Sequence, residues 1–226
     1  MKEKGIVLSS IDYKETSKIV YLYTPRGKIS IKAQGANKPK NGLLGFITTG
    51  NIVSFVASDT SFPSVIEYDI DKSILINEED LKVLEAIMVI FEVIKYLPDD
   101  INHKKTYSFI ENILKSLNSN NYLKLLSIFL IKITYSFGVA PNLKSCTRCN
   151  STTNLISFSV DAGGAICSSC TNSNNIDLLN IFKEYYYEKK DLSTYNEYNY
   201  SELLKVIDRY YKAHIHISLR LNLLIK

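Results

Sequence analysis

Apolar and polar residues alternate with a period of two along the first 70 residues of the chain. Short runs rich in Val, Ile, Tyr and Phe are separated by residues that favour turns, a pattern typical of β-strands. Pro25-Arg26-Gly27 predicts a tight hairpin, because Pro fixes one turn angle and Gly can adopt a positive φ. The five predicted strands are Gly5 to Ile11, Lys18 to Thr24, Lys28 to Ala33, Ile52 to Ala57 and Val65 to Ile70.

Five short strands are too few for a two-layer sandwich of ordinary size. They are enough for a small barrel of the OB type, and an SH3-like barrel is the main alternative. We therefore place the chain in the α+β class. The pattern predicts an OB-fold barrel over residues 1–76, followed by an α-helical domain over residues 77–226.

Near residue 77 the period changes from two to about 3.6, which indicates helices. Asn77 is a suitable N-cap, the acidic residues after it suit the positive end of a helix dipole, and Pro98 stops the helix. Its predicted apolar face comprises Leu81, Leu84, Ile87, Met88, Phe91 and Ile94. Further helices are predicted over residues 104–117, 122–137, 176–190 and 201–225, the last one long and amphipathic.

All four cysteines fall within one 25-residue segment, as Cys-x2-Cys, then 17 residues, then Cys-x2-Cys. They are Cys146, Cys149, Cys167 and Cys170. Each pair presents two thiolates from one knuckle, and two knuckles complete the tetrahedron that Zn2+ prefers. Four thiolates leave no open position, so the pattern predicts one structural zinc in a finger at about 143–173. The alternatives are two disulfides or unpaired buried thiols.

Between the knuckles, Phe158, Val160 and Ile166 alternate and predict a small hairpin with its turn at Asp161 to Gly164. His214 and His216 are not expected to be metal ligands. Residues two apart on a helix point in different directions, and the four thiolates already complete the coordination. Both histidines are therefore interpreted as surface or packing residues.

Basic side chains are concentrated near the N-terminus. Residues 1–58 contain nine basic and three acidic side chains, whereas the rest of the chain contains 18 and 20. This asymmetry is typical of a segment that binds a polyanion, with ordinary surface lysines as the alternative.

On the third strand Lys28, Ser30 and Lys32 share one face, and Tyr21 and Tyr23 share one side of the second strand. A positive groove with aromatic rings suits single-stranded nucleic acid, because the backbone is anionic and every base offers a π-face. The alternative is a barrel whose tyrosines are core residues and whose lysines are merely solvated.

No apolar stretch approaches the length of a membrane span, because Lys132 interrupts the segment Leu125 to Ile131. The N-terminus carries Glu3 and alternates like a strand, unlike a signal peptide. We therefore expect a cytoplasmic protein without a membrane partner. The chain also lacks the phosphate-binding loop, the nucleophile elbow and the His-Glu-x2-His helix of common enzyme classes, so nothing indicates catalysis.

The order of these parts resembles the RecO family of bacterial recombination mediators and DNA-repair proteins over essentially the whole chain. The cysteine segment, with Phe158 and Gly163-Gly164 between its two halves, is the most specific point of similarity. The other points are Gly5 to Leu8, Tyr13 to Ile19, Pro25 to Lys28, Lys38-Pro39 with Leu43 to Phe46, and His214 with Ser218 to Arg220.

The resemblance implies an OB-fold that binds single- and double-stranded DNA, and a helical domain with an inserted zinc finger. It implies no enzymatic turnover. Such a protein anneals complementary strands, binds the acidic, apolar C-terminal tail of the single-strand binding protein SSB, and acts with RecR to help RecA load on SSB-coated DNA in the nucleoid. The candidate DNA-binding residues are Arg26, Lys28, Lys32, Lys38 and Lys40. The candidate cations for an SSB-tail site are Lys205, Arg209, Lys212 and Arg220.

Two other functions stay open at this point. In the first, the chain is a zinc-containing regulator that reads duplex sequence. In the second, it is an interaction scaffold in which barrel and zinc finger bind only proteins. The zinc segment lacks a helix with base-reading side chains, which disfavours the regulator. DNA binding with little sequence preference and a steep salt dependence would separate a RecO-like function from both.

Overall fold

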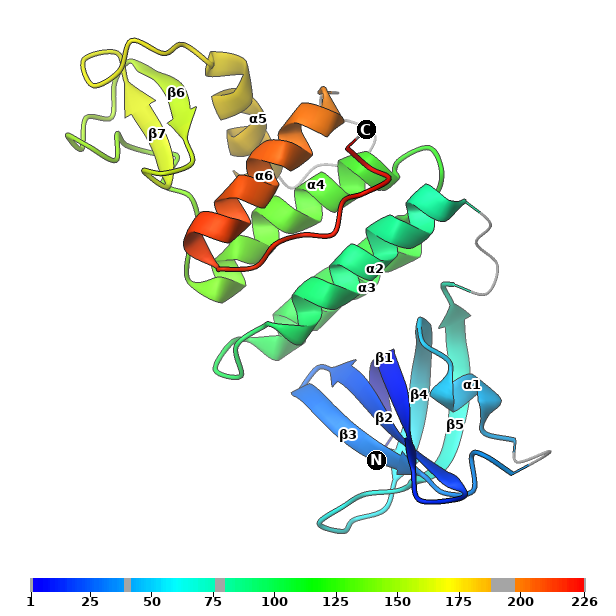
Figure 1. The fold of residues 1–226 in the computed structure, drawn as a ribbon. Coiled ribbons are helices and arrows are strands. Elements are labelled where there is room, and N and C mark those ends of the chain that lie inside the picture. Colours follow the sequence, from blue (N-terminus) through cyan, green and yellow to red (C-terminus); the bar gives the residue numbers. More distant parts are fainter. Residues whose placement is uncertain (1, 39–41, 76–79, 188–197, 226) are drawn as a thin grey trace. The chain divides into compact units, whose positions relative to one another are not determined.

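The structure is a computed structural model that describes residues 2–38, 42–75, 80–187 and 198–225 (Figure 1). The chain folds into two compact units, one formed by residues 1–84 and 91–117 and the other by residues 85–90 and 118–226. Helix α2 (Leu81–Lys95) therefore contributes residues to both units. In the part of the chain that is described, no helix has the length and apolarity that a membrane crossing requires.

Five antiparallel strands curl into one sheet in the first unit, coloured blue to cyan in Figure 1. The strands are β1 (Glu3–Tyr13), β2 (Ser17–Thr24), β3 (Gly27–Ala33), β4 (Asn51–Ala57) and β5 (Val65–Ser73), in the order β3-β2-β1-β4-β5. The two edges meet at one place, where the Lys32 N–H donates to the Pro63 carbonyl at 2.9 Å beside a parallel bridge to Ser64. The sheet is therefore OB-like but not closed by a continuous ladder, and the predicted fold class is confirmed.

The barrel core consists of the apolar residues that alternation turns inward, among them Val7, Val20, Leu22 and Phe55. The short helix α1 (Leu44–Ile47) adds Phe46, whose ring centroid lies 5.7 Å from that of Phe55. Burial of these side chains is the main source of the barrel's stability.

Helix α3 (His103–Ser116) covers one end of the outer face of β2. The Tyr23 hydroxyl lies 3.1 Å from Nδ1 of His103, and Nε2 of the same ring lies 3.0 Å from the Asp99 carbonyl. A carbonyl only accepts, so Nε2 carries the proton and Nδ1 accepts from Tyr23. The β2–β3 hairpin needs Gly27 here, because it has φ 113° and a Cβ would lie 3.1 Å from the imidazole of His103.

The predicted start of α2 is wrong, and its predicted apolar face is right for Ile87, Phe91 and Ile94 but wrong for two other residues. The helix begins at Leu81, and its N-cap is Asp80, whose carboxylate accepts from the Lys82 N–H, while Asn77 lies outside the described residues. Leu81 and Met88 are 67% and 48% exposed instead of facing the core. The other sides of the helix are largely buried. When a helix is apolar on nearly all sides, its sequence does not reveal which side is exposed.

The second unit is built around α4 (Tyr122–Ile133), which is buried from Leu125 to Ile131. A 3-10 turn, η1 (Thr134–Phe137), extends it as predicted to Gly138, which has φ 72°. Helices α5 (Ile176–Tyr187) and α6 (Tyr200–His214) pack on α4, and the hairpin of β6 (Leu155–Ser159) and β7 (Gly164–Cys167) lies beside α5 (Figure 1). A helical region with an inserted cysteine finger thus follows the barrel, as the predicted fold class requires, while α3 belongs to the same compact unit as the barrel.

The predicted last helix is too long, because α6 ends at His214 and not at Ile225. His216 has φ 61°, which breaks the helical path, and the β-branched residues on either side favour extended backbone. The segment after the helix finds side-chain acceptors instead: the Leu219 N–H donates to Asp208 at 2.9 Å and the Leu223 N–H donates to Glu85 at 2.8 Å.

Candidate nucleic-acid interface and metal centre

The four cysteines converge although 17 residues separate the two pairs. All four Sγ atoms lie within 4.8 Å of one another, and those of Cys149 and Cys167 are 3.5 Å apart without a disulfide bond. Thiolates about 2.3 Å from a common zinc ion would be about 3.8 Å apart in a tetrahedron. The spacing and the all-sulfur donor set therefore fit a closed four-coordinate metal site.

Two thiols of this cluster have strongly shifted pKa values. Burial raises the pKa of Cys146, but hydrogen bonds from the backbone N–H groups of Cys167, Arg148 and Cys149 outweigh it and lower the pKa to about 6. The pKa of Cys170 is raised to about 12, chiefly by hydrogen bonds between its thiol and those of Cys149 and Cys167. Thiolates this close repel one another, and a cation at their centre would offset that repulsion.

The finger is fixed to the helices around it. The Asn175 side chain accepts from the Phe158 N–H at 2.6 Å, and the Phe158 ring stacks on Phe182 of α5 with a centroid distance of 4.0 Å. The His214 Nε2 atom of α6 lies 2.7 Å from the Val160 carbonyl. His214 is therefore a packing residue, as predicted, and the finger's folding supports the position of two helices.

Lys28, the first cation predicted to meet DNA, has protein partners. Its ammonium group donates to the Leu97 carbonyl at 2.7 Å and to the Lys95 carbonyl at 3.3 Å, and it lies 3.4 Å from a carboxylate oxygen of Asp99. These carbonyls lie at the end of α2, where backbone acceptors have no partner within the helix. Lys28 thus caps this end of the helix with a positive charge.

The other predicted DNA-binding cations are spread over the barrel. Arg26 forms an ion pair with Glu3, Lys32 is half-buried on β3, and Lys38 is exposed in the turn after β3. Lys40 lies outside the described residues. Of the four described cations, Arg26 and Lys28 therefore have carboxylate partners, and the DNA-binding role of all five stays a prediction.

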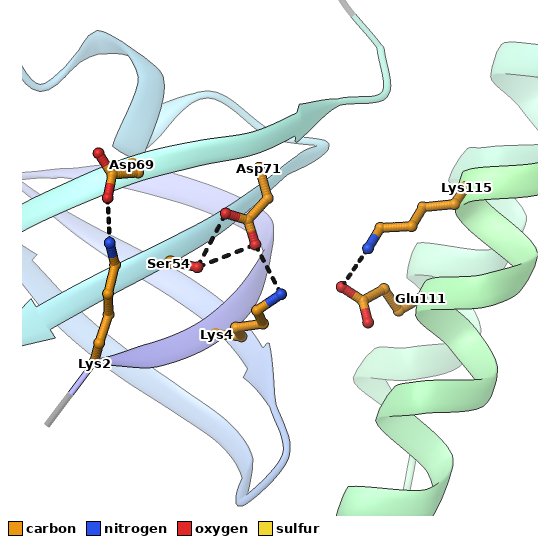
Figure 2. A network of polar contacts seen from close by, with 7 residues as sticks. All are labelled: Lys2, Lys4, Ser54, Asp69, Asp71, Glu111 and Lys115. Atoms are coloured by element: carbon orange, nitrogen blue, oxygen red, sulfur yellow. Dashed lines mark hydrogen bonds and ion pairs between the residues drawn. The ribbon is translucent and has the colours of Figure 1, made fainter.

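Carboxylates on β5 neutralise part of the N-terminal positive charge (Figure 2). Lys2 pairs with Asp69, and the Lys4 ammonium group lies 3.2 Å from Asp71, which also accepts from the Ser54 hydroxyl at 3.0 Å. Through residue 75 the chain contains ten basic and seven acidic side chains. The strong basic excess of residues 1–58 is therefore much smaller over the folded barrel.

The two tyrosines predicted to line an aromatic groove have different environments. Tyr23 is fully buried beneath α3, as the core alternative held, whereas Tyr21 is 38% exposed. Tyr21 borders a hollow of about 410 Å³ whose polar rim includes Ser30, Lys28 and Lys95. Only one of the two rings is available to a ligand.

A second hollow, of about 500 Å³, lies between the finger, α5 and α6. Phe158, Leu178 and Val206 provide apolar walls, while Arg209 and Lys212 lie at its border. These are two of the four cations that were predicted to edge a site for an SSB tail. The remaining two lie elsewhere: Lys205 pairs with Glu202 on α6, and Arg220 is exposed on the segment after α6.

The sequence matches two family descriptions in tandem. "Recombination protein O N terminal" matches residues 1–70, and "Recombination protein O C terminal" matches residues 78–222. The chain belongs to the RecO family. The RecO N-terminal match ends within β5, and the C-terminal match begins three residues before α2, so the two matches meet at the connection between barrel and helices.

Several curated relatives named "DNA repair protein RecO" align with almost the whole chain. The protein of Bacillus subtilis (strain 168) is 29% identical over 97% of this chain and 91% of the relative. That of Thermoanaerobacter sp. (strain X514) is 27% identical over 97% and 94%. That of Alkaliphilus metalliredigens (strain QYMF) is 26% identical over 95% and 94%.

This RecO-family chain also uses residues that the sequence did not single out. Asn175 lies just before α5, and its side chain joins the finger to that helix. Its place just before an apolar periodic segment was the available signal, because Asn is common where helices begin. The contact between Tyr23 and His103 had no such signal, since the two residues are 80 positions apart.

Proposed function

We propose that this RecO-family chain is a non-catalytic recombination mediator in DNA repair. It binds single- and double-stranded DNA, anneals complementary strands, and acts with RecR to help RecA load on SSB-coated single strands in the cytoplasm. The carrying observation is the pair of RecO family matches over residues 1–70 and 78–222, together with relatives named DNA repair proteins.

In this proposal the barrel is the main DNA-binding part. Its candidate contacts are Arg26, Lys28, Lys32, Lys38 and Lys40. Annealing brings two polyanionic strands together, and a surface with several cations lowers their repulsion and releases condensed counterions. The OB-like sheet supports the assignment, because this fold offers the outer face of β2 and β3 and two neighbouring loops to nucleic acids.

We assign one structural zinc ion to Cys146, Cys149, Cys167 and Cys170. The mutual distances of at most 4.8 Å support this, as does a donor set of four sulfurs, which zinc accepts more readily than a hard cation does. A bound zinc would hold four thiolates together and keep the finger folded. The ion takes no part in DNA chemistry in this proposal, because four sulfurs leave no position open for a substrate.

The hollow between the finger, α5 and α6 is our candidate site for the SSB tail. A peptide that is acidic and ends in apolar residues with a free carboxylate needs an apolar pocket and one or two cations. Phe158, Leu178 and Val206 supply the first and Arg209 the second, whereas Lys212 pairs with Asp208 at 2.6 Å and Asp161 also lines the hollow. Among the described residues, the Arg209 guanidinium has no carboxylate partner, so its charge is available to a ligand.

The test is annealing of complementary strands that are first coated with SSB. The full chain should accelerate annealing without nucleotide hydrolysis, show little sequence preference, and lose affinity steeply as salt rises. When the strands are coated with an SSB variant that lacks the acidic tail, the chain should no longer accelerate annealing. It should still accelerate annealing of strands that carry no SSB. Preference for one duplex sequence would favour a regulator, and absence of DNA binding would leave only a protein scaffold.

A further inference from the structure

Two aromatic rings and two lysines gather at one end of the barrel, away from the covered end of β2. Tyr13 ends β1, Lys14 follows it, Lys32 lies on β3, and Phe62 belongs to the loop between β4 and β5. The rings of Tyr13 and Phe62 meet edge to face, with centroids 5.9 Å apart. The Lys14 ammonium lies 5.5 Å from the Tyr13 centroid, and that of Lys32 lies 5.9 Å from the Phe62 centroid.

The loop around Phe62 is held in place by its own hydrogen bonds. The Ser58 N–H donates to the Ser64 carbonyl at 2.8 Å, and the Ser64 N–H donates back to the Ser58 hydroxyl at 2.9 Å. The Thr60 hydroxyl donates to the Phe62 carbonyl at 3.0 Å. Because Pro63 accepts from β3 at the next residue, Phe62 is fixed against β3 while its ring stays 37% exposed. A large apolar ring presented by an ordered loop is preorganised to receive a ligand.

The two lysines differ from other cations of the barrel. Lys18 pairs with Asp12, and Lys4 pairs with Asp71. Over the residues that the structure describes, neither Lys14 nor Lys32 has a carboxylate partner. Lys14 also has φ 54°, in the left-handed region where glycine or asparagine fits with less strain.

A continuous track joins this cluster to the hollow beside Tyr21. The cross-strand pairs Ile11–Ile19 and Ile19–Lys32 place these side chains on the outer face, one step along from Tyr21 and Ser30. Ile11 is 48% exposed and Tyr21 is 38% exposed. The outer face of β1, β2 and β3 thus carries rings, aliphatic surface and ammonium groups from the hollow of about 410 Å³ to Phe62.

We propose that this track holds single-stranded DNA, with one base stacked at Phe62 and Tyr13 and another lodged beside Tyr21. The inference rests on the proposed DNA-binding function and adds the residues that hold a single strand but not a duplex. Exposed rings can stack only on base faces, which are accessible in a single strand but are covered by neighbouring base pairs in a duplex. Lys14 and Lys32 then meet the phosphates on either side of the stacked base.

The local charge balance favours stacking as the main contribution. Glu15 and Asp59 are exposed on the two loops that flank the cluster, so the lysines are not part of a large positive surface. Removal of Phe62 should therefore weaken single-strand binding by a factor that stays nearly constant as salt rises. Removal of the Lys32 charge should instead reduce the salt dependence.

The chain contains no tryptophan, which allows a direct test. In Phe62→Trp the single indole reports the site, and an unlabelled oligothymidine should quench its fluorescence, whereas a duplex of equal length should not. In Phe62→Ala, the affinity for a labelled oligothymidine should fall about tenfold, while duplex affinity is retained. Two matched controls are Tyr135→Trp, at a ring that is 70% exposed, and Leu44→Ala, at a side chain that is 73% exposed.

The outcomes separate the two proposals. If the unsubstituted chain binds single strands but Phe62→Trp is not quenched and Phe62→Ala binds normally, the track is wrong and DNA binding stands elsewhere. Equal losses for single strands and duplex would also overturn it, since stacking would not be involved. If the unsubstituted chain binds neither DNA form, the proposed function fails and this inference fails with it.

Discussion

The ammonium group of Lys28 lies at the end of α2, where it serves protein acceptors as well as any ligand. Three hydrogen-bond or ion-pair partners, the carbonyls of Lys95 and Leu97 and the carboxylate of Asp99, surround it. Helix ends attract opposite charge because their last carbonyls are unsatisfied. A lysine chosen from sequence as a DNA contact is thus also a contact between the barrel and its helices.

Lys28→Met and Lys32→Met separate these two uses, because each keeps an unbranched side chain and removes one charge. Lys28→Met should lower the free energy of unfolding by about 1 kcal/mol, since a carbonyl cap is lost at a site that is partly exposed. Lys32→Met should change it by less than about 0.5 kcal/mol. Urea denaturation measures both. Equal stability of the two variants would contradict the capping role.

At the residue scale the sequence predicts chemistry better than surroundings. Two Cys-x2-Cys pairs identify a metal-binding cluster because each short turn brings two thiols together whatever the rest of the fold does. Tyr21 and Tyr23 were predicted to be equivalent, because alternation gives them the same face. Only the fold shows that α3 buries Tyr23 and leaves Tyr21 exposed.

Among the elements, strands were easier to predict than helix ends. All five strands lie where alternation and the turn residues place them. The end of α6 depends instead on distant acceptors, since Asp208 and Glu85 take the N–H groups of Leu219 and Leu223. An amphipathic pattern continues past His214 in the sequence. The same pattern also suits an extended segment in which alternate residues are buried, and this is the conformation that forms.

We expect the stability of the finger to depend on the proposed zinc ion. Cys167→Ser should remove the zinc, because a hydroxyl replaces one of four thiolates, and should release the finger's hold on α5 and α6. Elemental analysis should fall from one zinc per chain to none, and Tm should fall by about 5–10 °C. Ser168→Ala, at the exposed neighbouring residue, is the matched control. Purified reduced protein without stoichiometric metal would refute the assignment.

For the whole molecule, charge along the sequence is a weaker guide than charge over the fold. The basic excess ends at residue 58, but the barrel continues through β5, where Glu67, Asp69 and Asp71 lie in one row. Two of these carboxylates pair with Lys2 and Lys4 (Figure 2). The boundary between charged segments was therefore not a boundary of the structure, and DNA binding has to rest on particular side chains.

Lys32 and Arg209 allow a test of whether DNA and the acidic SSB tail bind different parts of the protein. Lys32→Glu should weaken DNA binding about tenfold or more, because it reverses a charge on the proposed track, and leave binding of an acidic tail peptide unchanged. Arg209→Glu should do the reverse, because it puts a carboxylate at the border of the hollow on α6. Anisotropy for DNA and calorimetry for the peptide, on the full chain, measure all four combinations. Loss of both ligands in either variant would contradict separate sites, and an unchanged peptide affinity in Arg209→Glu would exclude the hollow.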